Sequence, residues 1–146
     1  MEKRVLGLDV GTKTIGVAIS DPLGMTAQSV GTIRRRGLHE DLKAISGLVK
    51  KYRVQRIVVG LPLHMDGKLG EQGKEVVSFG KKIEEYLGVP VSFWDERLST
   101  VAAERILLEG DLSRSKRKKV IDKVAACLIL EGYLRREKSS EGGRSS

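Results

Sequence analysis

The sequence predicts an α/β fold in which helices flank a five-stranded mixed sheet. Three short segments rich in Val, Ile and Thr follow one another with only tight turns between them, which is typical of an antiparallel meander. Two more apolar strand-like segments then alternate with helical ones, which is typical of parallel crossovers that cover both faces of a sheet. In this arrangement the first strand lies inside the sheet, beside the fourth.

The elements of the first half follow from residue type and spacing. Strands rich in Val, Ile and Thr are expected at residues 4–9, 14–20 and 29–34. The turn that follows the second strand contains Pro22 and Gly24. A helix is expected over residues 40–52, because its apolar side chains recur on one face.

The second half alternates strands and helices. Residues 56–61 are almost entirely apolar, the pattern of a buried parallel strand, and Pro62 ends it. A loop over 63–72 leads to a second helix, whose inner face carries Val76, Phe79, Ile83 and Leu87. The remaining elements are expected at 91–95 (a strand), 101–109 (a helix capped by Thr100) and 116–136 (the last helix).

The length of 146 residues suits one domain with its own core, which we expect over residues 1–137. Residues 138–146 are Ser, Gly and charged residues and are expected to form a disordered tail. No apolar segment approaches the roughly 20 residues of a membrane span. The single cysteine, Cys127, lies in an apolar helical pattern. These features favour a cytoplasmic protein without an internal disulfide.

The net charge of +8 favours a polyanionic partner such as nucleic acid. Positive charge is concentrated at residues 34–36 and, more densely, at 114–119. The second concentration precedes or begins the last helix, where cations oppose the helix dipole and gain nothing for stability. Phosphate binding explains it better. The residues that we expect to bind phosphates there are Arg117, Lys118 and Lys119.

Asp9 lies in an apolar strand that is expected at the centre of the sheet. A carboxylate there is costly unless something such as a bound cation compensates it. The alternative is a turn residue, because Asp before Val-Gly is common in turns. Strand alternation and the presence of Asp21 in the next turn argue against that alternative.

Two further acids are candidates for the same site. Glu96 follows the last strand, and Asp122 shares a face of the last helix with Ala125 and Ala126, which is small enough to approach a sheet closely. Each has a plainer interpretation. Glu96 would be an exposed strand end paired with Arg97, and Asp122 an acid near a helix N-terminus.

Three carboxylates that converge from a central strand, a strand end and a closing helix fit phosphodiester hydrolysis with two divalent cations. Carboxylate oxygens suit Mg²⁺ or Mn²⁺. Lys13 would neutralise the scissile phosphate, and Thr12 would hydrogen-bond it together with N–H groups of the turn. We therefore predict that the catalytic and metal-binding residues are Asp9, Glu96 and Asp122.

Four segments together resemble the YqgF family, also called RuvX. Residues 9–21 begin Asp-Val-Gly-Thr-Lys-Thr-Ile-Gly, residues 60–72 begin Gly-Leu-Pro-Leu-His-Met-Asp-Gly, residues 95–100 read Asp-Glu-Arg-Leu-Ser-Thr, and residues 122–134 begin Asp-Lys-Val-Ala-Ala. The first segment is shared with other folds, whereas all four in this order are specific. The resemblance covers about residues 4–135.

The resemblance implies an RNase H-like fold and a bacterial cytosolic nuclease that matures the 5′ end of precursor 16S ribosomal RNA. Some members resemble Holliday junction resolvases instead. The family's acidic triad would fall on Asp9, Glu96 and Asp122, with Asp95 as a less favoured substitute for Glu96. Arg97 and the loop over 60–72 are expected to face the substrate, unless that loop is a plain surface connection.

Two other functions remain as alternatives. The turn at 9–12 also resembles the first phosphate-binding turn of actin-like phosphotransferases, but the chain has neither the second lobe of that fold nor its Asp-Gly-Gly turn. A non-catalytic RNA-binding assembly factor is the other alternative, and mutual repulsion among idle carboxylates argues against it. A resolvase is expected to be a two-fold dimer. Without a strong exposed apolar stripe, the sequence favours a monomer and structured RNA over a DNA junction.

Overall fold

The computed structural model describes residues 4–98 and 114–144, and it describes side chains at 4–98 and 124–139. Its five strands form one mixed sheet with the order β3-β2-β1-β4-β5. The strands are β1 (Arg4–Val10), β2 (Thr14–Ser20), β3 (Ala27–Arg34), β4 (Val54–Leu61) and β5 (Val91–Asp95). Pairing is antiparallel within β1–β3 and parallel from β1 through β4 to β5. The prediction that the first strand lies inside the sheet beside the fourth is confirmed.

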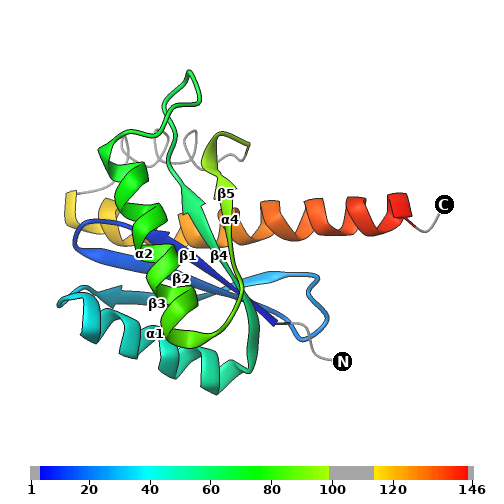
Figure 1. The fold of residues 1–146 in the computed structure, drawn as a ribbon, viewed down its shortest axis with the longest axis horizontal. Helices are drawn as coiled ribbons and strands as arrows, with labels where there is room; N and C mark the ends of the chain where they lie inside the picture. The colour runs from blue at the N-terminus through cyan, green and yellow to red at the C-terminus, as the bar shows by residue number, and fades with distance from the viewer. Residues whose placement is uncertain (1–3, 99–113, 145–146) are drawn as a thin grey trace.

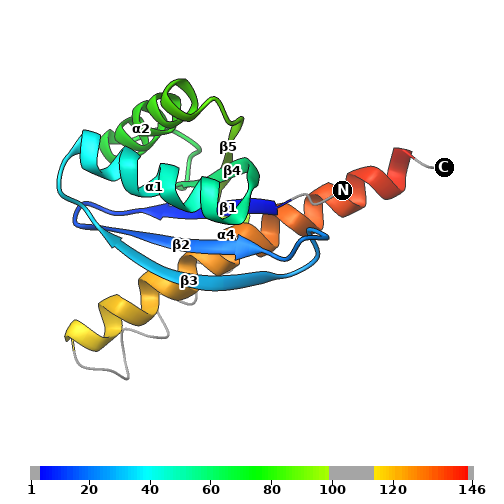
Figure 2. The same cartoon turned by 90° about the horizontal axis from the view of Figure 1, so that it is seen from below.

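Helices cover both faces of this sheet. The described helices are α1 (Leu38–Tyr52), α2 (Glu71–Leu87), the short 3-10 helix η1 (Glu96–Leu98) and α4 (Arg114–Arg144). Figure 2 shows α1 and α2 on one face and α4 on the other. The helix predicted at 101–109 lies outside the described residues. Two strands begin two residues earlier than expected: β3 begins at Ala27 and β4 begins at Val54.

Helix α4 continues past the end that we predicted from the sequence. It reaches Arg144, through residues that we expected to belong to a disordered tail, and not only residue 136. Leu134 is the last of its described side chains to be buried, and residues 135–139 are exposed. The loss of apolar residues therefore marks where the helix leaves the sheet. It does not end the helix, because no proline interrupts the polar segment that follows.

Strand alternation sends successive side chains to the two faces. Leu6, Leu8 and Val10 pack with α1 and α2, whereas Val5 packs with α4. On the α4 side, β1 carries Gly7, and a Cβ at that position would stand 2.9 Å from the Cβ of Leu130. Helix α4 consequently lies close to β1, and Figure 1 shows it crossing behind the sheet. Among the described helices, none combines the length and the apolar content needed to cross a bilayer.

Candidate active site

Asp9 lies on the α4 face of the central strand β1. It follows Gly7 by two residues, so alternation points both positions to the same face. Its side chain is buried, with 7% of its surface exposed. Across the sheet it pairs with Gly16 of β2, and the register Leu8–Val59 brings Gly60 of β4 level with it on the other side. Both neighbouring positions are therefore glycines, which place no side chain beside the carboxylate.

Glu96 occupies the space above Gly60. Its Oε1 lies 2.8 Å from the position that a Cβ on Gly60 would take, and the side chain of Ile129 from α4 reaches the same position. Glu96 is half-buried. Because adjacent strands lie about 4.8 Å apart, its carboxylate stands roughly one strand away from the strand that carries Asp9. The structure therefore brings these two predicted acids to one face.

Asp95 belongs to a different environment. Phe93, two residues before it, packs with the α1–α2 core, whereas Trp94 packs with α4. The carboxylate of Asp95 accepts hydrogen bonds from the Arg97 guanidinium, with Nη2–Oδ2 at 2.7 Å and Nε–Oδ1 at 3.0 Å. These bonds hold the pKa of Asp95 below its usual range. Arg97 thus forms its described ion pair with Asp95 and not with Glu96 as in the plainer interpretation.

The third predicted acid, Asp122, and the cationic residues Arg117, Lys118 and Lys119 have backbone positions in α4, but their side chains lie outside the described residues. The course of α4 fixes the level of position 122. Val5 at the start of β1 lines a cavity with Leu134, whereas Gly7, further along β1, lies against Ala126 and Leu130. Residue numbers thus rise along β1 while those of the α4 residues beside it fall, so α4 runs antiparallel to β1. Position 122, one turn before Ala126, comes level with the end of β1 that carries Asp9.

Arg35 supports the turn between β1 and β2. Its Nη1 donates a 2.8 Å hydrogen bond to the carbonyl of Gly11, and its Nε donates to the buried carboxylate of Asp41 on α1 at 3.1 Å. The guanidinium also lies over the ring of Phe79, 4.9 Å from its centroid. The sequence offered Arg35 only as part of a cationic cluster. The one further signal was Asp41, an acid in the first turn of a helix.

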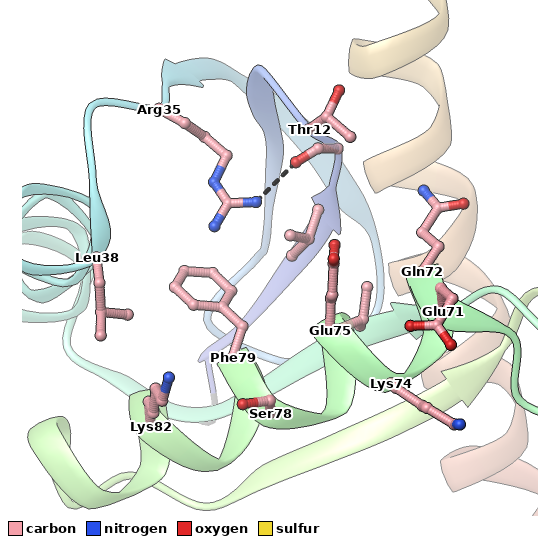
Figure 3. A pocket seen from close by; sticks show the side chains of 13 residues that line it. Thr12, Arg35, Leu38, Glu71, Gln72, Lys74, Glu75, Ser78, Phe79 and Lys82 are labelled. Carbon is pink, nitrogen blue, oxygen red and sulfur yellow. Dashed lines mark hydrogen bonds between the residues drawn. The ribbon is translucent and has the colours of Figure 1, made fainter.

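A cavity of about 430 Å³ lies beside this turn, on the α1–α2 side of the sheet. Figure 3 shows Arg35 and Thr12 on one side of it and Glu75, Ser78 and Lys82 of α2 on the other. Thr12, which we predicted as a substrate ligand, therefore stands next to this cavity. Neither Asp9 nor Glu96 lines it. The cavity and the carboxylates occupy opposite faces, and the β1–β2 turn separates them.

The donor set on the α4 face consists of hard oxygen atoms. Such oxygens suit Mg²⁺ or Mn²⁺ better than softer metals. Within the part of the chain whose side chains are described, no three His, Cys, Asp or Glu groups come together. Asp9 and Glu96 are two oxygen donors on one face, and the predicted third, Asp122, belongs to the undescribed side chains.

Comparison with known proteins covers nearly the whole chain. The family model described as "RuvX: Holliday junction resolvase" matches residues 3–136. A protein named "Putative pre-16S rRNA nuclease" from Caldanaerobacter subterraneus subsp. tengcongensis is 60% identical over 138 residues, which are 94% of this chain and 99% of the relative. One with the same name from Moorella thermoacetica is 59% identical over 133 residues, 91% of this chain and 95% of the relative.

Solved structures with a similar fold are distant in sequence. RuvC from T. thermophilus in complex with a Holliday junction substrate superposes with a TM-score of 0.57 at 14% identity, covering 92% of this chain and 96% of that one. The Holliday junction resolvase of fowlpox virus gives a TM-score of 0.50 at 14% identity, covering 91% and 99%. These similarities confirm the predicted fold class, a five-stranded mixed sheet of the RNase H-like type.

Proposed function

Because this chain belongs to the RuvX family, we propose that it is a metal-dependent nuclease that hydrolyses phosphodiester bonds of precursor 16S ribosomal RNA. One observation supports the proposal most strongly. Asp9 of β1 and Glu96, which follows β5 in η1, lie on the same face of the sheet, where the absence of a side chain at Gly60 admits the Glu96 carboxylate. A non-catalytic RNA-binding factor has no need of this arrangement, because paired carboxylates repel RNA.

Asp9, Glu96 and Asp122 would hold Mg²⁺ or Mn²⁺, which we propose as a pair of ions. Bound there, the ions would supply an activated water and stabilise the leaving oxygen. Geometry favours Glu96 over Asp95 as the second acid, since Asp95 accepts hydrogen bonds from Arg97. The three acids are thus assigned one from β1, one after β5 and one from α4.

The cationic residues are proposed to bind the RNA backbone. Lys13, at the β1–β2 turn, would contact the phosphate at the cleaved bond, and Thr12 would hydrogen-bond it. Arg117, Lys118 and Lys119 in the first turns of α4 would bind more distant phosphates. An enzyme that processes ribosomal RNA would work in the cytoplasm. A monomer suffices for this reaction, because only one strand is cut.

The name of the family model gives a four-way DNA junction as the second candidate substrate. A resolvase cuts two strands symmetrically and would act as a two-fold dimer. The relatives at 59–60% identity carry the ribosomal RNA name, and we therefore place RNA first. The substrate panel below separates the two.

A cleavage panel in Mn²⁺ tests the proposal. A precursor 16S rRNA fragment, a linear DNA duplex and a four-way DNA junction are each incubated with the wild type, Asp9→Asn, Glu96→Gln and a control, Glu40→Gln. Glu40 is an exposed carboxylate on α1. We expect cleavage of the RNA that the first two variants abolish and the control retains, with thermal unfolding unchanged in all. Cleavage by Asp9→Asn at the wild-type rate would refute the site.

Paired, symmetric nicks in the junction alone would make the chain a resolvase instead. No cleavage above the Asp9→Asn background, with the RNA still bound, would favour the binding factor. Asp95→Asn adds a separate comparison for the second acid. Full loss of activity in that variant, with Glu96→Gln still active, would reverse our assignment.

A further inference from the structure

The loop between β4 and α2, residues 62–70, projects from the body of the molecule (Figure 1). Met65 is the most exposed of the large apolar side chains in the described residues, with 97% of its surface in solvent. A single exposed apolar residue needs no explanation by itself. The conformation of the loop beneath Met65 is what distinguishes it.

Backbone hydrogen bonds hold the loop in one shape. Leu63 and Leu69 form an isolated antiparallel bridge at its base. Nearer the tip, the N–H of His64 donates to the carbonyl of Lys68 at 3.0 Å, and the N–H of Gly67 donates to the carbonyl of His64 at 2.8 Å. Gly67 has a φ of 86°, a conformation that favours glycine. These bonds fold the loop into a compact turn that leaves Met65 exposed.

Arg97 joins this loop to the end of β5, next to Glu96 in the chain. While its guanidinium is bound to Asp95, its Nη1 also points at the carbonyls of Met65, at 3.3 Å, and His64, at 3.5 Å. A Cβ on Gly67 would already stand 3.5 Å from the same Nη1. Arg97 directly follows Glu96 in the chain. One arginine side chain thus sets the distance between the loop and the backbone that carries Glu96.

We propose that Met65 is a wedge that inserts between two stacked bases of the nucleic acid lying on the catalytic face, and that Arg97 is the positioning residue that holds the wedge. This inference rests on the nuclease function proposed above. Apolar side chains, Met among them, partly unstack base steps of a duplex when they insert between them. Exposed Lys68, on the same loop, offers a cation to the phosphates of that nucleic acid. The substrate would then be a stacked, helical segment distorted beside the cleaved bond.

The wedge is tested by base unstacking, separately from cleavage. An Asp9→Asn protein is titrated onto a precursor rRNA fragment that carries 2-aminopurine, placed in turn at each position beside the cleavage site. We expect one position to brighten on binding. Met65→Ala and Met65→Gln, which keeps the length but adds an amide, should abolish that signal. Met25→Ala, which alters another exposed methionine on the distant β2–β3 turn, should retain it.

Cleavage gives the second readout, with Asp9 restored. If the wedge supplies only part of the few kcal/mol that unstacking requires, Met65→Ala slows cleavage about tenfold or more. Brightening and cleavage that are both unchanged in Met65→Gln would overturn the wedge and leave the nuclease intact. If the 2-aminopurine signal depends on Met65 but the protein with Asp9 restored cleaves none of the substrates, the wedge is supported and the proposed nuclease function is refuted.

Arg97→Lys tests the positioning role, because lysine keeps the charge but cannot bind Asp95 with two nitrogens. We expect it to reduce brightening as Met65→Ala does, and the double variant to show no further loss. The salt dependence of binding should not change. If the slope of log affinity against log salt concentration is smaller in magnitude by about one in Arg97→Lys, Arg97 itself binds a phosphate, which would overturn its positioning role.

Discussion

Gly60→Ala is the sharpest test of how the two acids come together. A methyl group at this position would stand 2.8 Å from Oε1 of Glu96 and would clash with Cδ1 of Ile129. The Cγ1 atom of the fully buried Ile129 would also stand 3.0 Å from it. All three are side-chain atoms, so the protein should fold with small shifts of Glu96 and Ile129. The displaced Glu96 carboxylate is then expected to leave its position near Asp9.

The stability cost should be small and the activity cost large. Overpacking a core costs about 1–3 kcal/mol, and the lower end applies where only side-chain ends must move. Replacing glycine in a compatible backbone returns roughly 0.4–1 kcal/mol through the unfolded chain. The net change is therefore about 0–2 kcal/mol. Cleavage should fall by about 100-fold, the typical effect of misplacing a catalytic group by 1 Å.

The assay measures urea unfolding and Mn²⁺-dependent cleavage on the same preparations. Gly80→Ala is the matched control, because a Cβ there would stand 2.5 Å from Cζ of Phe93 on the opposite face, far from the carboxylates. It should keep its activity. Ile129→Val added to Gly60→Ala removes the Cδ1 clash and should recover stability but not cleavage. If the double variant cleaves like Ile129→Val alone, the loss came from packing. Wild-type cleavage by Gly60→Ala itself would refute the placement of Glu96.

The remaining predictions concern charge. Replacing Arg117, Lys118 and Lys119 (residues 117–119) with Gln should lower the slope of log affinity against log salt by about two to three, and an unchanged slope would mean a merely solvated surface. Arg35→Ala should lower the free energy of unfolding by about 3 kcal/mol, because its buried carboxylate partner on α1 loses its counter-charge, whereas exposed Arg34→Ala should stay within about 0.5 kcal/mol. In an NMR titration, the Asp95 carboxyl should titrate below the usual aspartate range because Arg97 binds it, so this pair stabilises the fold at neutral pH and ceases to do so as pH falls through that lowered pKa. Arg97→Ala should return the midpoint to the usual range.

The order of elements could be predicted from the sequence because apolar periodicity reports burial. Strand β4 is apolar because both its faces are covered, and α2 shows its inner face through residues such as Phe79 and Ile83. The end of α4 was misplaced for the same reason. Periodicity vanished after Leu134, where the helix leaves the sheet, although the backbone stays helical to Arg144. Patterns of burial do not report helices that project into solvent.

The candidate site could be predicted only in part from the sequence. Strand alternation and an apolar context indicated Asp9, and its burial agrees with them. Our proposal of Glu96 over Asp95 draws on the structure, because it depends on which face of the sheet each of these two neighbouring residues takes. The contacts of Arg35 could not be predicted from the sequence, in which it is one of three adjacent arginines. Its partners, Gly11 and Asp41, come from a turn and a helix whose packing no local pattern encodes.

At the end of β5, the neighbouring residues Asp95 and Glu96 lie on opposite faces of the sheet and make different contacts. Asp95, the last residue of β5, lies on the α2 side with Phe93, whereas Glu96, the first residue of η1, reaches the α4 side over Gly60. Asp95 binds Arg97, which contacts the loop over residues 62–70, and Glu96 lies on the face that carries Asp9. A shift of one residue in the register of β5 would exchange the two faces, and both the second acid and the loop support would be lost together. The register of this short strand therefore sets both the proposed site and the support of the loop beside it.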